Sequence, residues 1–229
     1  MNTQSSVEAG PEIQEMVVVH RWLRELLRRT PDLVRALRPG DRARTEFVVG
    51  HLREVLQAVE DHHTNEDDHL WPVLSPRVTL QAGAVHRMEE QHRNIEWLAT
   101  EVANLLPALT ADPETGVRER VAGFLEDLRS AVSTHMDDEE RTILPLVSRY
   151  LTAAEWADFG RAAAAKTVRK PPKEKLAELS GLLAVATPAE RHIFLDRVPA
   201  PVRLLWRFVG RSAYRRNRER LYAPVEQQV

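Results

Sequence analysis

Four long stretches of this 229-residue chain carry apolar side chains at alternating spacings of three and four residues. An α-helix with this spacing turns one continuous face toward a packed interior. The clearest of these apolar seams are Val48, Leu52, Val55 and Val59 in one stretch and Val121, Leu125, Leu128 and Val132 in another. Alternating β-branched runs are few, so little of the chain favours strands. The sequence therefore predicts an all-α protein.

Turn and cap residues divide the first 150 residues into four helical segments, which we expect at about 12–38, 41–74, 80–106 and 113–150. Asp41 follows Pro39-Gly40 and is expected to cap the second segment. Asp112 and Pro113 are expected to be the N-cap and the first residue of the fourth segment. Pro31 interrupts the first segment, which is then either kinked or divided in two. Four long helices with short connections predict an up-down-up-down four-helix bundle.

The chain is expected to have three parts, namely a disordered N-terminus at 1–11, the bundle at 12–150 and a helical C-terminal extension at 151–229. In the extension, Thr152 and Thr187 are expected to cap helices. The sequence Lys170-Pro171-Pro172-Lys173 is expected to form a linker between them.

The last expected helix, at about 202–222, carries an arginine stripe beside an apolar stripe. The members are Arg203, Arg207, Arg211 and Arg215 in the first and Leu204, Leu205, Phe208 and Val209 in the second. One interpretation is contact with an anionic surface. The favoured interpretation is a solvated face on a helix that is docked on the bundle.

Composition excludes several classes of function. Because the chain has no cysteine, it forms no disulfide, Cys-ligated zinc or iron–sulfur site and has no Cys nucleophile. With 32 Lys and Arg against 34 Asp and Glu, the chain has no general attraction to nucleic acid, and no nucleic-acid partner is expected. No apolar run approaches the roughly 18 residues of a membrane span and the start lacks signal-peptide features, so we expect a cytoplasmic protein.

Each of the four apolar seams leads to one histidine, and on the second and fourth seams a glutamate follows one turn later. The six residues are His20, His62, Glu66, His92, His135 and Glu139. Burying an unpaired charge costs several kcal/mol, and the seams hold no Lys or Arg, so the predicted counter-charge is a metal. A His-x-x-x-Glu pair spans about 6 Å along one helix face, short enough for both to reach shared cations. The pair recurs with a proline six residues after each glutamate, which indicates an internal repeat.

The other histidines are placed by their angle and height relative to these seams. His63 lies about 100° from the seam and His86 about 120° from His92, so both are expected at the surface or its boundary. His51 lies about three turns below His62, too far to share a site. His69 is on the seam one turn past Glu66 and is a secondary candidate ligand. The neighbouring carboxylates are Asp67, Asp68, Asp137, Asp138 and Glu140. They are expected to be solvated, although any of them could orient a ligand imidazole.

The ordered set His20, His62-x-x-x-Glu66, His92 and His135-x-x-x-Glu139 resembles the hemerythrin family in its bacterial HHE cation-binding form, over about residues 12–150. The segments Glu66–Pro72 and Glu89–His92 are similar to that family's consensus, and residues 151–229 are similar to the tail of actinobacterial members. The resemblance implies a non-haem centre of two iron ions with an oxo or hydroxo bridge. It also implies that Glu66 and Glu139 bridge the irons and that the four histidines are terminal ligands.

One departure from the family bears on the predicted function. Oxygen-carrying hemerythrins look as if they take two histidines, spaced four residues apart, from their third helix. In this sequence the positions four residues before and four residues after His92 are Met88 and Glu96. This leaves a coordination position open unless His69, Glu89 or water fills it. Because an open position favours reaction at the metal, we expect binding of or reaction with O2 or peroxide, in oxidative-stress defence or sensing, including catalase-like decomposition of peroxide.

Three alternatives stay open on the sequence alone. One is a sensor or interaction module in which O2, NO or iron loading reshapes the bundle and the extension passes the change on. Another is a zinc or manganese site, because imidazole and carboxylate ligands accept these metals as well as iron. The third is a bundle with polar core layers and no metal.

Overall fold

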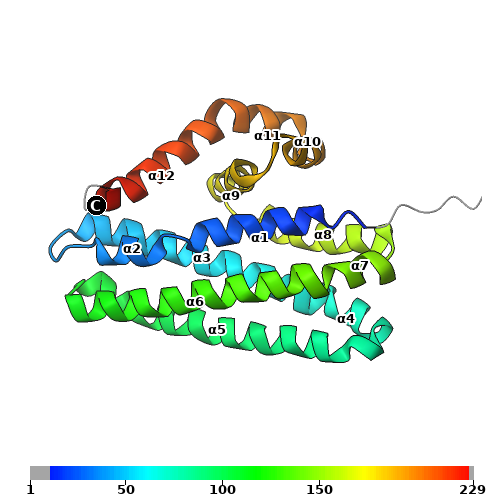
Figure 1. Ribbon diagram of the computed structural model, residues 1–229. Coiled ribbons are helices and arrows are strands. Elements are labelled where there is room, and N and C mark those ends of the chain that lie inside the picture. Colours follow the sequence, from blue (N-terminus) through cyan, green and yellow to red (C-terminus); the bar gives the residue numbers. More distant parts are fainter. Residues whose placement is uncertain (1–10, 227–229) are drawn as a thin grey trace, which may run out of the picture.

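The computed structural model describes residues 11–226 of the chain, so the predicted disordered N-terminus lies outside the described residues except for Pro11. The described residues form helices joined by turns and contain no β-strand, which confirms the all-α prediction. Figure 1 shows long helices lying side by side in a bundle, with an arch of further helices above one face. No helix among residues 11–226 combines the length and the apolar character needed to cross a membrane.

The bundle has four rods, as predicted. The first rod is α1 followed by α2, and the others are α3, α5 and α6 (Figure 1). Their bounds are Gln14–Leu27 for α1, Thr30–Arg35 for α2, Arg42–His69 for α3, Ala82–Ala111 for α5 and Thr115–Thr142 for α6. Short helices follow the second and fourth rods, namely α4 (Trp71–Leu74) with the 3-10 turns Ser75–Arg77 and Thr79–Gln81, and α7 (Leu144–Tyr150).

Local sequence signals explain several of the helix boundaries. The Asp41 side chain accepts a hydrogen bond from the Arg44 backbone N–H at 3.1 Å, which confirms this cap. Gly40, with φ of 85°, provides the turn before it. Pro31 lies in the first turn of α2, where its missing N–H costs no helical bond, so the first segment is two helices in sequence.

Two predicted helix ends were wrong. The third rod continues through Pro107 to Ala111, since Leu106 and Leu109 are buried in the core and their packing favours continued helix. The fourth rod begins at Thr115 rather than at Pro113, and Asp112 does not cap it. Asp112 is extended, with φ of −155° and ψ of 114°, as the residue before a proline prefers.

The apolar interior of the bundle is interrupted by one polar layer. On the side toward α4 and α7, the core includes Met16, Leu70, Met88 and Ile143. On the other side, a second cluster includes Leu23, Val59, Ile95 and Val132. The first and third rods contribute to both clusters, whereas the second and fourth rods contribute to the second cluster and the residues just after them, from Leu70 and Ile143 onward, to the first. The predicted histidines and glutamates occupy the chain positions between the two clusters. The four rods therefore present these residues at one height, as the sequence predicted.

The extension first follows the bundle and then arches away from it. Helix α8 (Ala153–Arg169) lies along α3 and α9 (Pro172–Val185) packs on α1. The chain continues through α10 (Pro188–Arg197), α11 (Ala200–Leu205), a π-helical turn at Trp206–Gly210 and α12 (Arg211–Glu226). The end of α12 returns to the bundle, where Leu221 and Tyr222 join the core beside α2 and α3 (Figure 1).

Both predicted caps of the extension are confirmed, but the linker is shorter than expected. The hydroxyls of Thr152 and Thr187 accept hydrogen bonds from the backbone N–H three residues later. Helix α9 starts at Pro172, so only Lys170 and Pro171 connect it to α8. The Lys170 ammonium also pairs with Asp61 of α3 at 2.9 Å, which ties the connection to the bundle.

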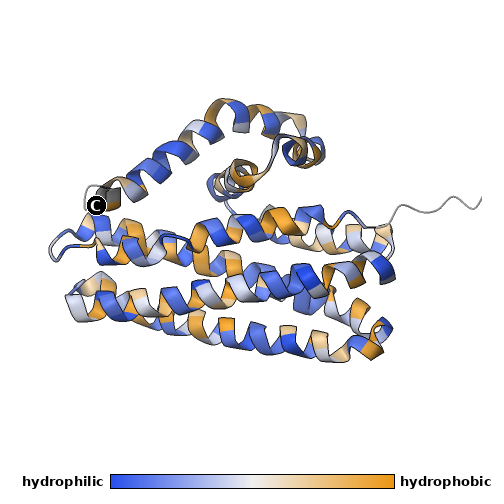
Figure 2. Ribbon diagram, viewed as in Figure 1, coloured by the Kyte–Doolittle hydropathy of each residue, from blue (hydrophilic) through white to orange (hydrophobic). Residues whose placement is uncertain are grey.

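The last helix departs from the favoured interpretation of its apolar stripe. Only its C-terminal end docks on the bundle, whereas Leu204, Leu205, Phe208 and Val209 are all exposed. Figure 2 shows apolar and polar residues alternating along this part of the arch, away from the bundle. The stripe therefore has no packing partner within the described part of the chain.

Candidate metal centre

Seven histidine and glutamate side chains meet in the polar layer of the bundle. Six of them are the residues predicted from the four seams, and the seventh is His63. The contributors are His20 from α1, His62, His63 and Glu66 from α3, His92 from α5, and His135 and Glu139 from α6. Six of the seven residues are buried, and the His62 side chain is 7% exposed.

The seven residues form two adjacent groups, each with ligand atoms within 4.8 Å of one another. The three-histidine group is His63, His92 and His135, and the mixed group is His20, His62, Glu66 and Glu139. Metal–ligand bonds of about 2.0–2.2 Å place two ligand atoms on one ion at most about 4.4 Å apart. Each group therefore has nearly the spacing of the ligands around a single ion.

Glu66 lies between the two groups. Its Oε1 is 3.2 Å from Nε2 of His62 in the mixed group, and its Oε2 is 3.3 Å from Nε2 of His92 in the three-histidine group. Burial, together with the nearby charge of Glu139, raises the pKa of the Glu66 carboxyl to about 7. A cation at this point would favour the ionised form.

Glu139 occupies the equivalent place on α6. Its Oε2 is 3.0 Å from Nε2 of His20 in the mixed group and 3.9 Å from Nε2 of His135 in the three-histidine group. Burial acts to raise the pKa of this carboxyl, but the adjacent charge of His20 outweighs burial, so the pKa lies below its usual range. Both carboxylates thus contact both groups of imidazoles.

The prediction that His63 lies at the surface was wrong. His63 is 6% exposed, and its ring centroid is 4.4 Å from that of His92 and 4.9 Å from that of His135. The helical period of 3.6 residues, counted from Val59, falls between positions 62 and 63. Both imidazoles therefore turn inward, on either side of the seam. The sequence signal was the spacing of four residues between Val59 and His63. Residues four apart lie on the same helix face just as residues three apart do, such as Val59 and His62.

The secondary candidates lie outside the cluster. His69, in the last turn of α3, is exposed, and so is Glu89 on α5. His86 is exposed, as predicted, and lies 3.3 Å from Glu90 on its own helix. His51 lies outside both groups, as predicted from its height.

Three of the imidazoles are held from outside by a polar side chain on a neighbouring helix. Nδ1 of His92 lies 2.8 Å from Oδ1 of Asp67, and Nδ1 of His20 lies 2.9 Å from Oε1 of Glu140. Nδ1 of His135 lies 3.2 Å from Oε1 of Gln91. Such partners favour a proton on Nδ1 and leave Nε2 directed inward. The sequence pointed to Asp67 and Glu140 as possible orienting groups, but it held no signal for Gln91.

The pKa values of the five buried or nearly buried imidazoles are shifted in opposite directions. For His62 and His63, burial and the neighbouring histidines hold the pKa well below its ordinary value, and burial lowers the pKa of His135 to about 3. For His20 and His92, burial also acts to lower the pKa, but adjacent carboxylates outweigh it and raise the pKa to about 9. Three of the five imidazoles are therefore held neutral, which is the form that binds metals.

The cluster fits a bound metal because its inward-facing polar atoms face only one another. Nε2 of His20, His62 and His63 and both carboxylate oxygens of Glu66 and Glu139 are buried without a hydrogen bond. Buried polar atoms are normally satisfied, and leaving them unpaired is costly. Imidazole and carboxylate are ligands for iron, zinc and manganese. The two groups together could hold two cations.

A surface pocket of about 510 Å³ leads from solvent to the edge of the cluster. Its lining includes Asp67 and Trp71 from the α3–α4 corner and Glu89 and His92 from α5. His92 is thus the ligand candidate that lines this pocket, and Glu89 lines it without joining either group. The pocket is large enough to hold a diatomic molecule or peroxide beside His92.

The comparison with protein families agrees with this geometry. The family model described as hemerythrin HHE cation binding domain matches residues 12–147. The chain belongs to the hemerythrin family. The matched residues run from the start of the first rod into α7 and contain all seven members of the cluster. No curated protein and no solved structure matches the chain. Membership of this cation-binding family and the two histidine and glutamate groups together indicate that the protein binds metal ions.

Proposed function

We propose that this hemerythrin-family protein is a non-haem di-iron protein that binds or reacts with O2 or peroxide, in oxidative-stress defence or sensing. The observation that carries the proposal is the pairing of two ligand groups, with Glu66 and Glu139 each close to imidazoles of both groups. A single-ion site would need only one group. Two groups joined by two carboxylates favour two ions side by side.

The ligand roles follow from the two groups. His63, His92 and His135 would hold one ion, His20 and His62 would hold the other, and Glu66 and Glu139 would bridge them. His63 from the second rod takes the place of the third-rod histidine whose absence distinguishes this sequence. The mixed group offers one imidazole fewer, so it would leave its ion more room for a ligand from outside the chain. Open positions favour reaction over simple storage of a ligand.

When bound, a di-iron centre supplies the electrons and the Lewis acidity for chemistry with O2 or peroxide. The chain supplies a dry, shaped environment. Leu23, Val59, Ile95 and Val132 close the cluster on one side, and Met88 lies on the other, all buried. Asp67, Glu140 and Gln91 hold three imidazoles in place, so that the ligands need little reorganisation when the ions bind.

The same reasoning supports a division of the chain. We propose that residues 12–150 are the metal-binding domain, because they contain the four rods, the cluster and the short helix α7. Residues 151–229 are then the helical extension, whose described residues add no member to the cluster. His69 and Glu89 are not proposed as ligands, since both side chains are exposed and lie outside the two groups.

Metal analysis combined with an absorption spectrum tests the proposal. Protein loaded with ferrous iron without oxygen is expected to hold two irons per chain, and its spectrum is expected to change on adding peroxide. Glu66→Ala and Glu139→Ala should lose most of the iron, because each removes a ligand from both ions. His86→Ala, which removes an exposed imidazole, is the control. One iron per chain, or a preference for zinc or manganese with no response to peroxide, would contradict it.

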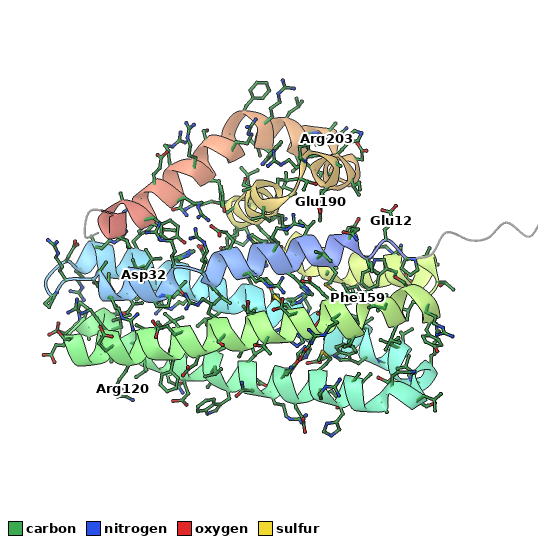
Figure 3. The ribbon with its side chains drawn as sticks, in the orientation of Figure 1. Glu12, Asp32, Arg120, Phe159, Glu190 and Arg203 are labelled. Carbon is green, nitrogen blue, oxygen red and sulfur yellow. The ribbon has the colours of Figure 1, made fainter. Side chains whose placement is uncertain are left out.

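A sensor is the second candidate function, because the extension contacts the helix that carries His20. Arg21, the next residue, donates hydrogen bonds to the Val185 carbonyl at 2.9 Å and to Glu190 at 3.0 and 3.2 Å. Figure 3 shows Glu190 on the part of the arch that faces the bundle. Negligible peroxide consumption by iron-loaded protein, together with a metal-dependent change in hydrogen exchange of α9 and α10, would favour this function over an enzyme.

A further inference from the structure

The part of the arch farthest from the bundle exposes an unusual number of large apolar side chains. We call this part the crest, and it consists of α11, the π-helical turn and the first turns of α12, residues 200–216. Its exposed apolar residues are Val202, Leu204, Leu205, Phe208 and Val209, with exposed fractions from 39% to 74%. Together with Ile193 of α10, they are six of the eight exposed large hydrophobic residues in the described part of the chain.

The outward orientation of these side chains is fixed by packing on the opposite face of the same helix. Gly210 is buried against α9, and a Cβ there would lie only 3.0 Å from Cδ1 of Leu176. The π-helical turn makes its interhelical contacts with α9 and includes Trp206. Since one face is used by α9, the apolar face toward solvent has no partner among residues 11–226.

The crest is also the most basic part of the chain. Residues 200–216 include five arginines and no acidic residue, a net charge of +5, so the rest of the chain carries −7 of the total of −2. Arg207, Arg211, Arg215 and Arg216 are exposed. Arg211 lies over the Trp206 ring and Arg215 is 3.7 Å from Glu219 of the next turn. Arg211 and Arg215 thus stay beside the apolar face of their own segment.

We propose that the crest binds the surface of membranes rich in anionic lipids. Leu204, Leu205 and Phe208 would enter the boundary between headgroups and acyl chains, while Arg207 and Arg211 contact lipid phosphates. A helix with an apolar face flanked by arginines is typical of binding in the plane of a membrane. The outermost position of the crest allows contact with a flat surface before the bundle meets it (Figure 1).

Charge and shape favour an anionic lipid surface over a folded protein partner. Arginines concentrated on one segment of an otherwise acidic molecule are attracted to a negatively charged surface and orient the molecule toward it. The apolar side chains project from a ridge rather than line a groove, so a fluid surface can receive them without matching a fixed shape. The arch holds the ridge away from the bundle, and Figure 3 shows Arg203 on this outer part.

Vesicle flotation with the full-length protein tests the proposal. Wild-type protein is expected to float with phosphatidylcholine vesicles that contain phosphatidylglycerol and not with phosphatidylcholine alone, and added salt should weaken the binding. The double variant Leu204→Ser/Phe208→Ser is expected to bind at least about tenfold more weakly, because it removes two inserted side chains. Arg207→Gln/Arg211→Gln should weaken binding by a similar factor.

The matched control is Leu80→Ser/Trp97→Ser, which replaces two exposed apolar residues of the bundle and should leave flotation unchanged. All the substituted residues are at least partly exposed, so helical content by circular dichroism and iron content should match wild type. Iron content also separates this proposal from that of the di-iron centre. Equal flotation of the crest variant and wild type would overturn the proposal. So would a wild-type dimer that Leu204→Ser/Phe208→Ser dissociates, without vesicle binding, since the crest would then join two copies.

Discussion

Nδ1 of His92, on α5, lies 2.8 Å from Oδ1 of Asp67, on α3, and this contact joins two rods at the edge of the metal centre. The His92 side chain is 6% exposed whereas Asp67 is 49% exposed, so a solvated carboxylate orients a buried imidazole. Asp67 stands one residue after Glu66, so a single turn of α3 supplies both a proposed bridging ligand and the group that positions the ligand opposite.

Asp67→Ala is expected to weaken iron binding about 10- to 100-fold, as the loss of such an orienting partner does in other metal sites. Asp67→Asn should weaken binding less, because its amide oxygen can still accept the Nδ1–H hydrogen bond. Competition with a chelator measures both affinities, and the absorption spectrum reports whether His92 still binds. Asp68→Ala replaces an exposed neighbour and is the control. If Asp67→Ala binds iron as tightly as Asp68→Ala, then Asp67 does not position His92.

His63→Ala is expected to reduce the iron content from two ions per chain to about one. The substitution removes one of three imidazoles from the three-histidine group and leaves the mixed group complete. The matched control is again His86→Ala, since that side chain is exposed. Elemental analysis after loading without oxygen measures the content. Full loading of His63→Ala would show that water or another side chain completes this group.

The contrast between His62 and His63 shows how far helical periodicity carries a prediction. The seams placed six side chains of the cluster and their common height, because each histidine was one helical step from the apolar seam and each glutamate one turn further. They could not decide between adjacent positions, since 3.6 residues per turn leaves two neighbours equally close to the seam. The polar layer accommodates both imidazoles, and only the positions of the other three rods reveal that there is room.

Helix ends and outer contacts were harder to predict for a different reason. Pro107 is compatible with either an end or a continuation of the helix. The helix continues to Ala111 because Leu109 packs in the core, and this tertiary contact is not visible in the sequence. Gln91 contacts His135 from a neighbouring rod, which depends on how α5 and α6 are rotated against each other. The exposed stripe at Leu204 likewise has the periodicity of a docked face. Its lack of a partner follows from the path of the arch.

The stability of the protein is expected to fall in mild acid partly because of His51. Burial, together with the nearby charges of Arg218 and Arg44, lowers the pKa of His51 to about 4, against 6.5 for the unfolded chain. The folded state therefore binds fewer protons than the unfolded state between these values. This contribution to stability is complete above about pH 6.5 and is lost as the pH falls toward 4.

His51→Gln should remove this part of the pH dependence. Relative to the variant, wild type is expected to lose about 2 kcal/mol of unfolding free energy between pH 7.5 and pH 5. Urea unfolding at several pH values measures the difference, and the metal centre titrates equally in both proteins. Parallel curves for wild type and His51→Gln would show that His51 is protonated in the folded protein.

Two glycine-to-alanine substitutions are expected to change stability in opposite directions. Helix α9 approaches α1 closely at Gly181, where an added Cβ would lie 3.0 Å from Cδ1 of Trp22 and closer still to its Nε1. The indole is nearly buried and cannot move aside without cost, so Gly181→Ala should destabilise the protein by about 1–3 kcal/mol. At Gly123, within α6, a Cβ would meet nothing within 4 Å, so Gly123→Ala should stabilise it by about 0.5–1 kcal/mol. Chemical unfolding measures both changes. A neutral Gly181→Ala would mean that α9 sits on α1 loosely enough to shift, and the hydrogen bonds of Arg21 to the extension would then not transmit a change at His20.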